Sequence, residues 1–71
     1  MINCSAIMQK RYQMRMSQAV VADRAGVDRK VVMKIENRPS YDPRLSFLTN
    51  IAEVLGMKVG EMIVEIEQGE G

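Results

Sequence analysis

The segment MSQAVVADRAGVDRKVVMKIEN constrains the fold of this chain more than any other feature. Ser17 is a favoured N-cap residue, so it can begin a helix that runs to about Ala25. Gly26 then supplies a residue that tolerates a positive φ, as the end of a helix often requires. Asp28 is a second favoured N-cap and begins another helix, which lasts to about Asn37. The segment is therefore predicted to form two short helices joined by a tight turn.

Two further helices are predicted, one on each side of this pair. The first starts at residue 3 or 5, runs to Met14 and places Arg11 on its inward face. The second begins at Asp42-Pro43, a pairing of an N-cap with a first-turn proline, and ends at Gly56. Side chains that recur at helical spacing and would face inward are Ile7, Arg11, Met14, Leu45, Leu48, Ile51, Ala52 and Leu55.

The last segment of the chain is ambiguous. Residues 59–67 present an apolar face if they are helical, whereas residues 64–67 alternate between apolar and acidic side chains as a strand does. Helix is the favoured prediction for this segment, and residues 68–71 are expected to be frayed. We therefore predict one all-α domain over residues 1–71, with five short helices of which the last is either a helix or a short strand.

Composition excludes several classes of protein. The 71 residues include no histidine and a single cysteine, so neither a disulfide within the chain nor a zinc site is expected. Catalysis has no candidate residues, because a general base at neutral pH would have to be a tuned carboxylate or lysine. No apolar run approaches the roughly 20 residues of a membrane span, and no signal peptide is recognisable. We expect a cytoplasmic protein that is not an enzyme and needs no cofactor or metal.

Charge is distributed unevenly along the chain. Residues 1–44 contain nine Lys or Arg against four acidic residues, whereas residues 45–71 contain one Lys against five Glu. The second helix of the central pair is divided across its width. Val32 and Ile35 lie on one face, whereas Arg29, Lys30, Met33 and Lys34 lie on the other. A helix with one apolar and one basic stripe suits entry into the major groove of DNA. Double-stranded DNA is therefore the expected partner, and the basic candidates are Arg29, Lys30 and Lys34.

The chain resembles the lambda-repressor and Cro type of helix-turn-helix protein over about residues 5–63, with the helix-turn-helix itself at about 17–37. Arg15 stands where that family often has a glycine between its first two helices. The residues that carry the resemblance are Ser17-Gln18, Ala22, Ala25-Gly26-Val27, Val32, Ile35-Glu36-Asn37, Pro43, Leu45, Leu48, Ile51-Ala52 and Leu55-Gly56.

The resemblance implies a role for each matching position. Base contacts map to Arg29, Lys30, Lys34 and Asp28, although for Asp28 the role of a helix cap is favoured over a base contact. Contacts with the DNA backbone map to the start of the second helix and to the region after the third, at Ser17, Gln18, Asn37, Arg38, Ser40 and Tyr41. Gln18 would also brace a base-reading side chain. Finally, Arg11 on the first helix would pair with Glu36 at the end of the third.

Together these features predict a transcriptional regulator, with repression as the favoured activity, that binds a near-palindromic operator as a homodimer. A chain of this size buries only about 60% of its surface, and dimerisation is a common way to add stability. The dimer contact is predicted on the last segment, at Met57, Val59, Met62 and Ile66. Two alternatives remain open: an antitoxin-type autoregulator whose C-terminal segment also binds a toxin, and a protein-interaction module that does not bind DNA.

Overall fold

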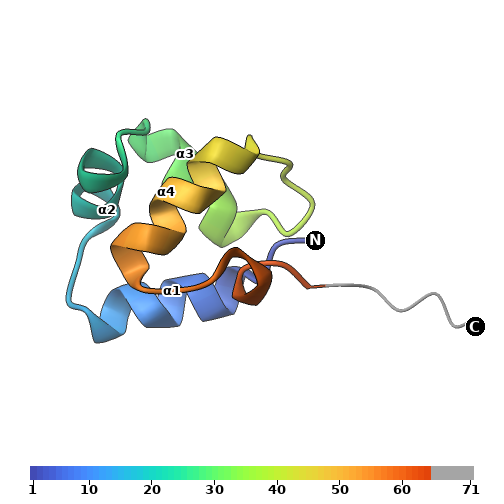
Figure 1. Cartoon of the computed structure of the whole chain (residues 1–71), viewed down its shortest axis with the longest axis horizontal. Helices are drawn as coiled ribbons and strands as arrows, with labels where there is room; N and C mark the ends of the chain where they lie inside the picture. Colours follow the sequence, from blue (N-terminus) through green and yellow to red (C-terminus); the bar gives the residue numbers. More distant parts are fainter. Residues whose placement is uncertain (65–71) are drawn as a thin grey trace, which may run out of the picture.

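A computed structural model describes residues 1–64 of the chain. Over this range the chain is all-α, as predicted, and the central helix pair lies where the sequence placed it (Figure 1). The described residues contain no fifth α-helix, so the predicted count of five was wrong by one. The elements are α1 (Cys4–Gln13), α2 (Gln18–Ala25), α3 (Arg29–Asn37), α4 (Leu45–Leu55) and a 3-10 turn, η1 (Val59–Glu61).

The start signals of α2 and α3 are confirmed as side-chain caps. The Ser17 hydroxyl accepts a hydrogen bond from the Val20 amide at 3.1 Å, and the Asp28 carboxylate accepts one from the Lys30 amide at 2.8 Å. Each bond satisfies one of the amides that the first turn of a helix leaves unpaired. Between the two helices Gly26 takes a left-handed conformation with φ of 71°. The short turn that results fixes α2 against α3.

The predicted start of α4 at Asp42-Pro43 was wrong, because the helix begins at Leu45. The Arg44 carbonyl accepts the first hydrogen bonds of the helix, from the amides of Phe47 and Leu48. Asp42 and Pro43 stay in the preceding loop, where both lie around a surface hollow. An Asp-Pro pair occurs in loops as well as at the start of helices, so it was not sufficient to locate the first residue of α4.

The segment after Gly56 departs from the favoured prediction of a helix. Within residues 57–64 only η1 is helical, and Ile63 then forms an isolated antiparallel bridge with Ile2. The Asn3 amide donates to the Met62 carbonyl at 2.8 Å, and the Val64 amide donates to the Met1 carbonyl at 2.7 Å. The predicted alternative, a short strand, is not formed within residues 1–64 either, since Ile63 makes only this isolated bridge. The part of the prediction that covers residues 65–67 lies outside the described residues, as does the expected fraying of residues 68–71.

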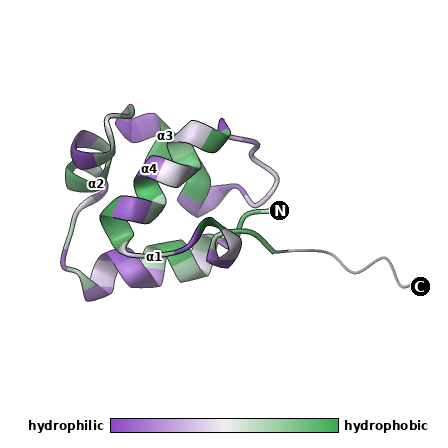
Figure 2. Cartoon of the chain, viewed as in Figure 1, coloured by the Kyte–Doolittle hydropathy of each residue, from purple (hydrophilic) through white to green (hydrophobic). Residues whose placement is uncertain are grey.

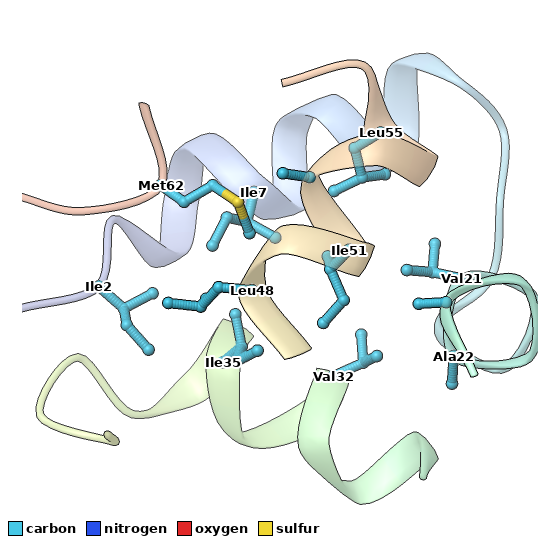
Figure 3. Close-up of a cluster of buried hydrophobic side chains, with 12 residues drawn as sticks. Ile2, Ile7, Val21, Ala22, Val32, Ile35, Leu48, Ile51, Leu55 and Met62 are labelled. Carbon is cyan, nitrogen blue, oxygen red and sulfur yellow. The ribbon is translucent and has the colours of Figure 1, made fainter. Parts of the chain in front are cut away.

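The hydrophobic core surrounds α4, which faces the other three helices. Figure 3 shows side chains of α4 meeting Ile7 from α1, Val21 from α2 and Ile35 from α3. In Figure 2 the apolar sides of the helices are turned toward this centre and the hydrophilic sides outward. The two ends of the described chain close the core from one side, and they contribute Ile2 and Met62.

One ion pair lies at the edge of this core. The Arg11 and Glu36 side chains are only 8% and 1% exposed, and they form two hydrogen bonds, of 2.6 and 2.8 Å. Arg11 also donates to the Met16 carbonyl at 2.9 Å. The hydrogen bond to Glu36 raises the pKa of the Arg11 guanidinium, so it stays charged at any ordinary pH. The predicted pair is confirmed, and it ties α1 to the end of α3.

The inward positions predicted for Met14 and Leu45 were wrong, since these residues are 40% and 67% exposed. Leu45 is the first residue of α4, so its side chain lies at the open end of the helix. Helix α1 ends at Gln13, and Arg15 takes a left-handed conformation with φ of 57° that turns the chain toward α2. Met14 therefore sits at the cap, where the helical periodicity that predicted its direction no longer applies. None of the helices described is long and apolar enough to cross a membrane.

Candidate nucleic-acid interface

The basic stripe of α3 lies on the surface, as the sequence predicts. Arg29, Lys30 and Lys34 are exposed, whereas Val32 and Ile35 on the opposite face are buried. Among residues 1–64 the only ion pair joins Arg11 to Glu36, so no acidic side chain of this range neutralises the three cations directly. A fixed helix that presents uncompensated positive charge has the electrostatic character of a nucleic-acid contact.

The start of α2 is connected to α3 by a hydrogen bond between Gln18 and Glu36. The Gln18 amide nitrogen donates to the Glu36 carboxylate at 3.1 Å, so Gln18 joins the pair that holds α1 to α3. This bond leaves the Gln18 side-chain oxygen to act as an acceptor. Ser17 is exposed, and its hydroxyl keeps a donor hydrogen after accepting the cap bond from Val20. The bracing of a base-reading side chain by Gln18 stays a prediction.

Asp28 acts as the cap of α3. Its carboxylate is engaged with the Lys30 amide, which confirms the cap and leaves the predicted base contact without support from its geometry. Capping also places a negative charge at the N-terminal end of α3, where the helix dipole favours it. The carboxylate would repel a phosphate group brought near this end of the helix.

The end of α3 carries the residues predicted to contact the DNA backbone. The Lys34 ammonium lies 5.6 Å from the centre of the Tyr41 ring, a cation–π arrangement that directs Lys34 toward the loop. The Asn37 amide donates to the Met33 carbonyl at 2.8 Å. Arg38 and Ser40 are exposed, and Tyr41 is half-buried. The structure thus brings these predicted residues together around one end of the helix.

A shallow surface hollow of about 230 Å³ runs along this part of α3. Four of the residues around it were predicted as site residues. The fifth, Met33, was placed on the same exposed face by the helical repeat, because position 33 lies one turn beyond Arg29 and Lys30. The hollow is lined by Lys30, Met33, Lys34, Asn37 and Arg38.

The predicted dimer residues are only partly available at the surface. Met57 and Val59 are half-buried against the core. Met62 is completely buried, because the Ile2–Ile63 bridge folds its side chain into the core of its own chain. Its assignment to a dimer contact was therefore wrong. Ile66 lies outside the described residues. In the range that the structure covers, His, Cys, Asp and Glu form no group of three or more that could hold a metal ion.

Comparison with known proteins agrees with this architecture. The structure is similar to the N-terminal DNA binding domain of SinR from Bacillus subtilis, with a TM-score of 0.78 and 27% sequence identity. That similarity covers 87% of this chain and 90% of the SinR domain. No curated protein sequence matches the chain significantly. A family model described as helix-turn-helix matches residues 7–62, which include the α2–α3 pair, the Arg11–Glu36 contact and most of the core. The chain therefore belongs to the helix-turn-helix family, as its resemblance to the lambda-repressor and Cro type predicted.

Proposed function

We propose that this chain is a DNA-binding transcriptional regulator that places α3 in the major groove of double-stranded DNA. The observation that carries the proposal is the exposed cationic face of α3, held in place by a buried ion pair and by the packing of α2. Its fold is similar to a domain that binds DNA, which supports the same conclusion. The Arg29 guanidinium suits a paired contact with the O6 and N7 atoms of guanine. Lys30 and Lys34 are proposed to contribute further base contacts.

Contacts with the DNA backbone are proposed at both edges of this face. At one edge the hydroxyl of Ser17, the side chain of Gln18 and the amides at the start of α2 would meet a phosphate. At the other edge the basic and polar groups that follow α3 would do the same. The residues proposed there are Asn37, Arg38, Ser40 and Tyr41, with Asp28 kept as a cap.

We further propose that the protein works as a homodimer in the cytoplasm and represses transcription by blocking polymerase. Two recognition helices related by a two-fold axis would read a near-palindromic operator, with half-sites about 34 Å apart. Because Met62 is part of the core, the surface proposed for the dimer contact consists of three exposed apolar residues, Met1, Ile63 and Val64.

The proposal is tested by separating specific from non-specific binding. Duplexes are first selected from a random pool, and affinity is then measured on the selected site and on an unrelated duplex. Arg29→Ala should lose about 1–3 kcal/mol on the selected site and little on the unrelated one, because it removes a base contact. Arg24→Ala removes the same charge from the exposed surface of α2 and serves as the matched control, with no preferential loss on the selected site.

Two results would contradict this proposal. Equal losses for Arg29→Ala on both duplexes would mean that Arg29 contacts only phosphate. If no duplex is selected and binding to any duplex is insensitive to salt, the chain is a protein-interaction module that has kept the fold without binding DNA.

The antiparallel bridge at Ile63 favours one second candidate, an antitoxin-type autoregulator. A strand that continued beyond Val64 could pair with a partner protein through its free edge, as exposed edges commonly do. Co-purification of this chain with the product of a neighbouring gene, lost when the chain is cut after Val64, would support this function over a simple repressor.

A further inference from the structure

We infer that Met33 gives this protein a preference for thymine at one position of each half-site, by packing against the 5-methyl group of that base. The inference rests on the proposed function and deepens it, since it names a base that the recognition surface would select.

Met33 has no evident part in the stability of the fold. Its side chain is 39% exposed, and it is absent from the apolar side chains that pack against the core. Single exposed apolar side chains are common in proteins, so exposure alone indicates nothing about Met33. Its position among charged neighbours is what distinguishes it from the other exposed apolar residues.

The helical repeat places Met33 inside the cationic face. With about 100° of rotation per residue, Met33 projects between the directions of Arg29 and Lys30, one turn further along α3. It is also the only apolar residue among the described side chains that line the hollow on α3. Any duplex that meets the cations of this face therefore meets Met33 as well.

The chemistry of the major groove limits what Met33 can contact favourably. The base edges there present hydrogen-bond donors and acceptors, and the 5-methyl group of thymine is the apolar group among them. A methionine side chain pressed against a donor or acceptor would remove its water without offering a partner of equal strength. Against a methyl group it buries apolar surface on both sides, and its unbranched side chain can adjust to the position of the methyl.

The polar neighbours of Met33 leave it free to make this contact. The Asn37 amide is bonded to the Met33 carbonyl at 2.8 Å, which holds the Asn37 side chain back against its own helix. The Lys34 ammonium lies over the Tyr41 ring, toward the loop. In the unbound protein both side chains are therefore held toward the end of α3, which leaves Met33 exposed on this face.

Single replacements of thymine by deoxyuridine test the inference, because they remove only the methyl group. The probe is the tightest duplex recovered from a random pool, with each thymine replaced in turn. At one position per half-site the wild type should bind about threefold to fivefold more weakly, the expected loss for one buried methyl. Met33→Ala should bind the thymine and deoxyuridine duplexes equally well at that position.

Met14→Ala is the matched control, since Met14 is 40% exposed but lies at the end of α1. It should keep the wild-type response to deoxyuridine, and thermal unfolding of each variant verifies that it is folded. Sequence-specific binding that no deoxyuridine replacement weakens would overturn the inference and leave the proposed function standing. A Met33→Ala variant that responds to deoxyuridine as the wild type does would overturn it in the same way. If no duplex is selected at all, the proposed function fails and the thymine preference fails with it.

Discussion

Within residues 1–64, α1, α2 and α4 end in the same backbone turn, but only two of them use glycine for it. Gly26 and Gly56 take φ values of 71° and 66°, whereas Arg15 is held at 57°. An L-residue in this left-handed conformation costs roughly 1–2 kcal/mol, which glycine avoids. The turn is closed in each case by the amide that follows the left-handed residue, in the bonds Met16 to Arg11, Val27 to Ala22 and Met57 to Ala52.

Replacing Arg15 by glycine should therefore stabilise the protein. The relief of the left-handed strain exceeds the extra freedom that glycine gives the unfolded chain, and a net gain of about 0.5–1 kcal/mol is expected. Denaturant unfolding measures it. Arg15→Ala removes the same side chain but keeps the strain, so it should not stabilise. A gain for Arg15→Ala as large as that for Arg15→Gly would show that the charge of Arg15, and not its backbone, is responsible.

Gly26→Ala and Gly56→Ala provide the converse measurement. A Cβ atom at either position would meet nothing within 4 Å, so the substitution adds backbone strain without any steric clash. Each should therefore destabilise the fold by about 1 kcal/mol. A neutral result at both glycines would contradict the explanation given for Arg15.

At the scale of the elements, the helices differ in how their first turns are satisfied. Side chains cap three of them: Asn3 for α1, Ser17 for α2 and Asp28 for α3. Among the helices described, α4 alone begins without a side-chain cap, because Arg44 occupies the N-cap position. A cation at the N-terminal end of a helix also opposes the helix dipole. The first turn of α4 is therefore less well stabilised than the first turns of α1, α2 and α3.

Arg44→Asp should correct both faults and stabilise the protein by about 0.5–2 kcal/mol. Arg44→Ala separates the two effects, since it removes the charge without adding a cap. Ser17→Ala removes an existing cap from α2 and should lose a similar amount, which calibrates the expected gain. If Arg44→Asp leaves the midpoint of denaturation unchanged while Ser17→Ala lowers it, the start of α4 is already satisfied in another way.

These elements show which parts of the structure the sequence could predict. Caps and helix ends depend on groups within four residues, so Ser17, Gly26 and Asp28 could be placed from the sequence alone. The start of α4 could not, because Asp42-Pro43 is equally compatible with the loop that precedes the helix. The position of Met62 depends on the pairing of Ile63 with Ile2, and periodicity carries no information about segments so far apart. For the candidate site, helical spacing predicted the basic face of α3, and the resemblance supplied the pairing of Arg11 with Glu36.

At the scale of the whole molecule, the two ends of the described chain leave an apolar surface. Met1, Ile63 and Val64 are exposed and lie together, because backbone hydrogen bonds join the two segments. Because Met62 is buried, we propose that the dimer contact lies on this surface instead. The reason for expecting a dimer is unchanged, since a chain this short has a small core. A two-fold contact here would use the same residues on both subunits.

Val64→Glu should weaken this dimer, since it places two like charges across the two-fold axis. Sedimentation at micromolar concentration, with no DNA present, measures the effect. Met14→Glu introduces the same charge at an exposed apolar residue far from the chain ends and should leave association unchanged. If the wild type sediments as a monomer and binds an asymmetric site as one, the symmetric arrangement is refuted.

The bridge between Ile2 and Ile63 also sets the order in which this protein can mature on the ribosome. Ile2 is synthesised before α1, whereas the segment that covers it, with Met62 and Ile63, is synthesised only after α4. The contacts between α2 and α3 join neighbours in sequence, and such contacts form fastest. A nascent chain can therefore form the α2–α3 contacts before the core is closed, whereas Ile2 stays open to chaperones and proteases until Met62 and Ile63 have emerged.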